Sequence, residues 1–431
     1  MDRVRVRASC AGALMLLLTA AAASAQSFNG VGFLDGVVRE SYAWGISPSG
    51  NFVVGESSST DSGGLTEAFQ RNSEGLVALG ALQPSNFLSV ANDCTDNFVI
   101  VGFSRYGTVG TLFNAFRATD TLIDASDSLG DLPGGSNLSS AQAVSADGNV
   151  TVGFGSSDVG GMNRRQAFAH FASTGMLRPL GTLPGDDTST AYAVSADGTR
   201  IAGQSSISLT TRAVVWTVHP DTTITAQHLP AIAGGFDFAQ AWGISGDGMV
   251  VVGDSDSPNG TEACKWIGGQ VIGLGDLPGG EFNSSANDAS ADGSIIVGYG
   301  TSETSGFLGE AVFWDADGVH SIRDTLVNAG QDLTGWSLQV ANAVSADGRT
   351  IVGNGTDPDG NPQGWIAVLP EPNPCLADFN QDGNVDADDL GDFINCYFAL
   401  PPCPGAEFNG DGNIDADDLG DFINTYFGVP C

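Results

Sequence analysis

The sequence predicts an all-β protein, a seven-bladed β-propeller, followed by a small α-helical domain. Three observations predict the propeller. One unit of about 50 residues recurs seven times, each unit holds about four short strands, and the N-terminal segment matches what the last unit lacks. The predicted organisation is 1–25 as a leader, 26–370 as the propeller, 371–374 as a linker and 375–431 as the helical domain.

Each unit is recognised by an anchor segment of the form A-x-a-[VI]-S-a-D-G-x-x-[VI]-x-G. Apolar residues on both sides of the Ser-x-Asp-Gly sequence indicate a hairpin, because Asp-Gly favours the tight turn that antiparallel strands need. We therefore expect the repeated Asp to shape a turn and not to bind a metal or a substrate. The anchors lie at 43–55, 91–102, 141–153, 191–203, 241–253, 286–298 and 341–353.

Two further elements follow each anchor. One is an aromatic or β-branched strand, such as EAFQR at Glu67 or EAVFW at Glu310, and the other is an L-G-x-L element, often followed by P-G-G, as at 129–135. With the two strands of the anchor, these elements give about four strands per unit, which is the content of one propeller blade.

The ends of the array predict how the ring closes. Residues 28–36 resemble the L-G-x-L-P-G-G element without its preceding strands, and the last unit stops at Pro370 without that element. The N-terminal strand can therefore supply the missing edge of the last blade, so that no strand edge stays unpaired. We expect seven blades, with six or eight as alternatives because two units are degraded.

The repeated motifs resemble those of the bacterial extracellular HAF-repeat family, whose aromatic strand is similar to EAFQR at Glu67 and QAFAH at Gln166. The resemblance covers residues 28–370. It implies a secreted repeat protein and assigns no activity to it.

The first 25 residues have the pattern of a secretory signal peptide: a basic stretch at 3–7, an apolar stretch at 11–22, and Ala23-Ser24-Ala25 before the cleavage point. We therefore expect a secreted protein, extracellular or at the cell surface, without a membrane span. The formal net charge is −35, from 50 acidic and 15 basic residues. This charge disfavours nucleic acid as a partner and favours divalent cations.

Residues 375–431 contain the same acidic twelve-residue loop twice, at 378–389 and 407–418. Oxygen-bearing side chains stand at loop positions 1, 3, 5, 9 and 12, and Gly stands at position 6, as in calcium-binding loops. We expect Ca²⁺ as the cofactor, with one ion in each loop. The ligands that this spacing predicts are Asp378, Asn380, Asp382, Asp386 and Asp389, then Glu407, Asn409, Asp411, Asp415 and Asp418.

A helix is predicted after each loop and not before it, since apolar residues recur there at helical spacing while prolines crowd the upstream sides. A duplicated loop with only the exiting helix resembles a type I dockerin. The resemblance covers 375–431, implies a cohesin-like partner, and adds the carbonyl groups of Asn384 and Asn413 to the metal ligands. Loop positions 10 and 11 hold Ala-Asp where dockerins often present hydroxyl groups, which leaves a cell-surface glycan open as the other partner.

The cysteines divide into two groups. Cys94 and Cys264 lie in different repeats, and we expect both to be buried and free. Four cysteines in the tail suggest two disulfides in an oxidising compartment, with three possible pairings. These are Cys375, Cys396, Cys403 and Cys431.

The large domain shows no recognisable catalytic set. Its four histidines are scattered among the units, and most of its tryptophans occupy repeated strand positions, which favours core packing over sugar stacking. We therefore expect no catalytic residue and interpret the chain as a non-enzymatic binding or scaffold protein with a calcium-dependent tether. The alternative is a dockerin-bearing carbohydrate-active hydrolase, which would need two carboxylates converging on one face from positions that break the repeat.

Overall fold

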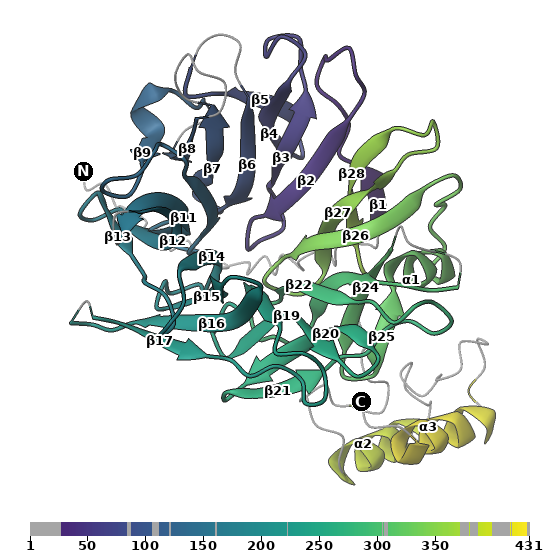
Figure 1. The fold of residues 1–431 in the computed structure, drawn as a ribbon. Coiled ribbons are helices and arrows are strands. Elements are labelled where there is room, and N and C mark those ends of the chain that lie inside the picture. Colours follow the sequence, from purple (N-terminus) through teal and green to yellow (C-terminus); the bar gives the residue numbers. More distant parts are fainter. Residues whose placement is uncertain are drawn as a thin grey trace, which may run out of the picture.

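The computed structural model shows seven four-stranded antiparallel sheets around a common axis, a closed β-propeller (Figure 1). The predicted seven blades are confirmed, and the alternatives of six or eight are wrong. The structure describes residues 27–83, 88–105, 112–119, 122–159, 162–221, 223–303, 305, 309–370, 379, 387–398, 414 and 416–428.

Blades 1 to 6 are each continuous in sequence, and in each sheet the strands follow chain order. Blade 1 consists of β2 (Ser41–Ile46), β3 (Val53–Ser58), β4 (Thr66–Asn72) and β5 (Gly75–Gly80). Blade 2 consists of β6 (Ser89–Cys94), β7 (Ile100–Arg105), β8 (Phe113–Ala118) and β9 (Ser128–Gly130), and the 3₁₀ turn η1 (Ala125–Asp127) precedes β9. Blade 3 consists of β10 (Ser140–Val144), β11 (Val150–Val159), β12 (Met162–Phe171) and β13 (Met176–Pro179). Blade 4 consists of β14 (Thr188–Val194), β15 (Arg200–Ile207), β16 (Thr210–Val218) and β17 (Ile224–His228). Blade 5 consists of β18 (Ala239–Ile244), β19 (Val250–Ser257), β20 (Gly260–Ile267) and β21 (Gln270–Gly273). Blade 6 consists of β22 (Ser285–Ala289), β23 (Ile296–Gly300), β24 (Glu310–Asp315) and β25 (Gly318–Ser321).

Blade 7 joins the two ends of the array. It consists of β26 (Ser337–Val344), β27 (Thr350–Thr356), β28 (Pro362–Val368) and the N-terminal strand β1 (Ser27–Gly30). β1 pairs antiparallel with β28, so that Ser27 lies opposite Val368. The predicted closure by the N-terminal strand is therefore confirmed.

The hydrophobic core lies between the blades, and the described residues form one apolar cluster at each of the seven interfaces. Four tryptophans are fully buried in these clusters, as predicted for repeated strand positions: Trp216, Trp266, Trp314 and Trp365. Three others stay partly exposed: Trp44, Trp242 and Trp336. Burial of the large rings across each interface holds neighbouring blades together.

A β-bulge between the first two strands of each blade explains the alanine and the closing glycine of the anchor. In blade 3, Ala141 lies opposite Gly153, and the register then shifts so that no residue of β11 lies opposite Gln142. A Cβ atom on Gly153 would lie 2.0 Å from the carbonyl oxygen of Ser140, so a side chain does not fit there. The same shift and the same close approach occur in all seven blades.

The Ser-x-Asp-Gly segment forms the turn of the same hairpin, as predicted. In blade 3, the Ser145 hydroxyl donates to the Asp147 carboxylate at 2.6 Å, and that carboxylate accepts the backbone N–H of Asn149 at 2.9 Å. Gly148 has a φ of 76°, which Gly adopts without strain. The repeated Asp is thus used by its own turn.

Within the described residues, three α-helices accompany the sheets. α1 (Ile322–Asn328) lies between blades 6 and 7 and was not predicted, whereas α2 (Ala387–Tyr397) and α3 (Ala416–Gly428) follow the two acidic loops as predicted. The rings of Phe393 and Phe422 stack at a centroid distance of 3.9 Å, which joins α2 to α3. In the part of the chain that the structure describes, no helix is long and apolar enough to cross a membrane.

Candidate functional site

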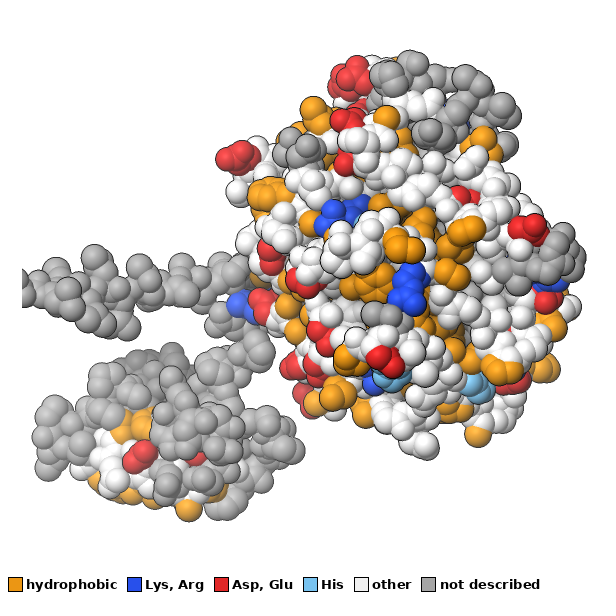
Figure 2. Space-filling model, turned by 90° about the vertical axis from the view of Figure 1, so that its left-hand side faces the viewer, with side chains coloured by type: hydrophobic (Ala, Val, Ile, Leu, Met, Phe, Trp, Pro, Cys, Tyr) orange, Lys and Arg blue, Asp and Glu red, His pale blue; other side chains and the backbone are white. Residues whose placement is uncertain are grey.

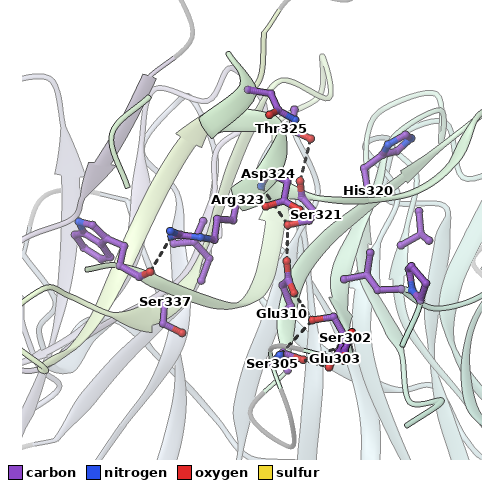
Figure 3. A pocket seen from close by; sticks show the side chains of 17 residues that line it. Ser302, Glu303, Ser305, Glu310, His320, Ser321, Arg323, Asp324, Thr325 and Ser337 are labelled. Carbon is purple, nitrogen blue, oxygen red and sulfur yellow. Dashed lines mark hydrogen bonds between the residues drawn. The ribbon is translucent and has the colours of Figure 1, made fainter. Parts of the chain in front are cut away.

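A cavity of about 860 Å³ lies where the repeat is interrupted between blades 6 and 7 (Figure 3). Its walls come from Ser302, Glu303 and Ser305, the start of β24, the end of β25, α1 and the start of β26. Hydroxyl and carboxylate groups line the cavity together with apolar side chains such as Leu277 and Trp336. We call it the blade 6–7 pocket.

Glu310 organises one wall of this pocket. Its carboxylate accepts the hydroxyl of Ser302 at 2.6 Å and the hydroxyl of Ser321 at 2.5 Å. Ser321 also caps α1, because its Oγ accepts the backbone N–H of Asp324 at 3.2 Å. One carboxylate therefore fixes Ser302, the end of β25 and the start of the helix in one arrangement, as the dashed lines in Figure 3 show.

Arg323 holds the opposite wall. Its guanidinium donates to the carbonyl oxygens of Leu333 at 3.1 Å and of Trp336 at 2.9 Å. The Trp336 ring in turn meets Phe28 edge-on at 5.0 Å between centroids. The guanidinium thus fixes the segment that enters β26, and the closing strand β1 supports the same segment.

His320 is separate from the Glu310 group. Its Nε2 lies 2.9 Å from the Asp315 carboxylate, and its ring stacks on Phe313 at 4.8 Å. The hydroxyls of Ser302 and Ser321 donate to Glu310 and not to His320, so neither is placed as a nucleophile activated by the histidine. The arrangement suits binding of a polar molecule through several positioned hydrogen-bonding groups.

The pocket was not predicted from the sequence. The signal that could have found it is the interval from Gly298 to Gly353, the longest between consecutive closing glycines. Within that interval, Ile322 and Leu326 are four residues apart and fully buried, which is the spacing of one helical face. The extra length of this interval accommodates α1, which has no counterpart in the other described repeats.

Of the twelve predicted metal ligands, the structure describes two. Asp389 and Asp418 are the third residues of the matching helices α2 and α3, and both are fully buried. The other ten lie outside the described residues: Asp378, Asn380, Asp382, Asn384, Asp386, Glu407, Asn409, Asp411, Asn413 and Asp415.

The cysteines follow the prediction as far as they are described. Cys94 and Cys264 are buried and free, and burial raises the pKa of both thiols well above the ordinary value. Cys396 on α2 is disulfide-bonded. The remaining tail cysteines, Cys375, Cys403 and Cys431, lie outside the described residues.

The outer side of blades 2 to 4 has mixed chemistry. Figure 2 shows acidic side chains scattered over this side, with basic side chains in separate spots among uncharged groups. The charge of the propeller is therefore spread over this side.

Comparison with known proteins supports the fold alone. No family model matches the chain, which leaves the HAF-repeat and dockerin resemblances without a match, and no curated protein matches it in sequence. A puromycin hydrolase structure aligns with a TM-score of 0.50 at 11% identity, over 74% of this chain and 50% of that one. A puromycin-hydrolyzing peptidase of Mycobacterium tuberculosis aligns with a TM-score of 0.49 at 15% identity, over 78% of this chain and 52% of that one. A putative TolB from Agrobacterium tumefaciens gives 0.39 at 13% identity, over 77% and 91%.

Proposed function

We propose that this chain is a secreted, non-enzymatic binding protein, in which the propeller holds an extracellular ligand and the C-terminal helices belong to a calcium-dependent tether. The observation that supports binding is the construction of the blade 6–7 pocket. Glu310 and Arg323 are both committed to holding its walls, so the pocket presents polar groups in fixed positions. Fixed polar groups reduce the entropy that a ligand loses on binding.

Calcium is supported by the burial of Asp389 and Asp418 at the same position in two matching helices. Position 12 of such a loop is where a carboxylate that points inward meets the ion. We propose two Ca²⁺ ions, held by the predicted loop ligands, and a dockerin-like role for 375–431 toward a cohesin-like protein or a cell-surface glycan.

Calorimetry on the full mature chain tests the tether. Ca²⁺ titration is expected to show two bound ions, and EDTA is expected to lower the melting temperature of the tail while the propeller transition stays in place. The matched variants Asp389→Asn and Asp418→Asn should each remove one ion. A full complement of bound ions in both variants would contradict the assignment.

The alternative function is a carbohydrate-active hydrolase, and one observation favours it. Glu303 and Glu310 both line the blade 6–7 pocket, and glycoside hydrolases use paired carboxylates. Incubating the protein with a polysaccharide panel, while measuring both binding and reducing-sugar release, separates the two functions. Release that Glu310→Gln abolishes would establish the hydrolase, and binding without release supports the binding protein.

A further inference from the structure

The bulge in each blade places one unpaired residue on the strand nearest the propeller axis. The first strands of neighbouring blades contact one another around this axis, and together they form what we call the inner ring (Figure 1). The seven bulge residues occupy equivalent places in it. They are Trp44, Asn92, Gln142, Tyr192, Trp242, Asn287 and Asn342.

The asparagines at this position have a structural task. The Asn92 amide donates to the carbonyl oxygen of Ala141 in the next blade at 2.7 Å, and Asn287 donates to Ala341 at 2.8 Å. Asn342 donates to Ala43 at 2.8 Å, across the junction between the last blade and the first. An asparagine here therefore links adjacent blades, which is a sufficient reason for its presence.

The two tryptophans at this position make a different contact. The indole N–H of Trp44 donates to the Glu56 carboxylate at 3.3 Å, and that of Trp242 donates to the Asp254 carboxylate at 2.6 Å. Each partner directly follows the closing glycine of its own blade. In the other blades that place holds no acid: Phe103, Phe154, Gln204, Tyr299 and Asn354. Tryptophan and carboxylate therefore occur together, in blades 1 and 5.

These pairs are not what core packing alone would select. Trp44 is 36% exposed, whereas the four repeated-strand tryptophans have at most 1% exposure. Desolvation raises the pKa of Glu56 and of Asp254, so the fold pays to keep both carboxylates in place. The indoles of Trp44 and Trp242 donate within their own blade, whereas the asparagines donate to a carbonyl group of the next blade.

A second aromatic ring accompanies each tryptophan. Tyr42 stacks on Trp44 at 5.9 Å with 15° between the planes, and Tyr192, the bulge residue of blade 4, meets Trp242 at 4.4 Å. Both pairs thus combine an aromatic surface with a carboxylate at its edge. A pyranose ring has the complementary chemistry, since its C–H face is apolar and its hydroxyl groups at the rim donate hydrogen bonds.

We propose that the Trp44–Glu56 and Trp242–Asp254 pairs are two sugar-binding positions of the inner ring, which take neutral oligosaccharides. The inference rests on the proposed binding function and names its ligand class and its residues. The indole face carries a sugar ring. The Glu56 carboxylate accepts a sugar hydroxyl while it also holds the indole of Trp44. The Asp254 carboxylate, only 6% exposed, holds the indole of Trp242 in place. Ser285 donates to the Asp254 carboxylate at 2.9 Å and orients the second position from blade 6.

The test uses the full mature protein in Ca²⁺ and a probe set of cellohexaose, xylohexaose, mannohexaose and chitohexaose. Tryptophan fluorescence and calorimetry should detect binding of at least one probe. Trp44→Ala and Trp242→Ala should each weaken it by about tenfold or more, since one lost stacking contact of this kind corresponds to about 1.4 kcal/mol. Glu56→Gln should weaken it only a few fold, because the amide oxygen still accepts.

The control is Phe98→Asn. Phe98 is 43% exposed in the turn between β6 and β7 and belongs to neither pair, and its φ of 64° suits asparagine. It should bind the probe like the unchanged protein. Trp44→Phe keeps an aromatic face if Trp44→Ala fails to fold, and it should bind measurably more weakly, because the indole hydrogen bond is lost.

The remaining outcomes overturn the proposal in distinguishable ways. If no probe binds, the inner ring is not a site for these sugars. If a probe binds equally well to both tryptophan variants but not to Glu310→Gln, the binding function holds and the blade 6–7 pocket is its site. If choline binds instead and Glu56→Gln abolishes that binding, the pairs recognise a cation and the sugar assignment is wrong.

Discussion

Two aspartates of one hairpin, only four residues apart, have pKa values shifted in opposite directions. In the turn of blade 6, hydrogen bonds from the Ser294 N–H and hydroxyl and from the Ser290 hydroxyl lower the pKa of Asp292. In the inner ring of the same blade, burial raises the pKa of Asp288 to about 7, although this carboxylate also accepts two backbone N–H groups. Asp93 in blade 2 is also buried, with a pKa of about 7. Exposure to water, and not the number of hydrogen bonds, decides the direction of the shift.

The turn aspartate is a regular part of the repeat, whereas the inner-ring aspartate is present in some blades and absent from others. The turn aspartate recurs in most units because it stabilises the hairpin while remaining solvated. The inner-ring aspartates occur in two blades, each accepting the N–H of a valine in the following blade: Val144 for Asp93 and Val344 for Asp288. A mutation of a buried inner-ring aspartate should therefore change the free energy of unfolding more than a mutation of a turn aspartate.

The largest effect is expected at the bulge. Gly153→Ala would place a Cβ 2.0 Å from the carbonyl oxygen of Ser140 and should destabilise the propeller by about 3 kcal/mol or more, because the backbone itself must move. Chemical denaturation followed by circular dichroism measures this. Gly175→Ala, at a turn glycine with no atom near its Cβ, should cost clearly less, and equal losses would contradict the argument.

An intermediate effect is expected from the buried carboxylates. The folded pKa of Asp93 and of Asp288 lies above the unfolded value, so their contribution to stability is complete below about pH 4 and is lost as the pH rises through about 7. The single variant Asp288→Asn should therefore gain stability over the unchanged protein at pH 8.5, by about 2 kcal/mol. Melting both proteins between pH 5 and 8.5 tests this, and a constant difference across that range would refute it.

The smallest effect is expected at the turn. Asp292→Ala removes an acceptor of three hydrogen bonds near solvent and should cost about 1 kcal/mol at pH 7. Because the folded pKa of Asp292 is lowered, this stabilisation exists above the unfolded pKa and disappears as the pH falls through the folded one. The difference in melting temperature between variant and parent should shrink toward pH 3, the reverse of the inner-ring pair.

The sequence allowed the ring to be predicted because the ring consists of repeated local signals. Anchors, turns, blade number and the strand exchange at 28–36 all follow from residues that recur or that complete a missing copy. The bulge could not be predicted. In the sequence, the closing glycine looks like the glycine at the end of an ordinary strand, and only the structure shows that a carbonyl group of the neighbouring strand lies close to it.

The pocket and the inner-ring pairs were missed for a different reason. Tertiary contacts create them, between residues such as Glu310 and Ser302, or Trp44 and Glu56, whose types are unremarkable along the chain. The expectation that most tryptophans pack in the core is confirmed for the four on repeated strands, but it gave no means of separating Trp44 and Trp242 from them. Each of the two tryptophans directly follows the first alanine of its anchor, and only the register shift shows that the tryptophan has no partner residue on the next strand.

The pairing of β1 with β28 also determines how the molecule would respond to pulling. Ser27 lies opposite Val368, so the chain enters β1 and leaves β28 at the same end of the pair. Tension applied through the segments before 27 and after 368 would therefore open the two strands like a zipper, breaking hydrogen bonds one after another and not all at once. The ring would yield first at this seam, at low force, while the other six blades kept their sheets.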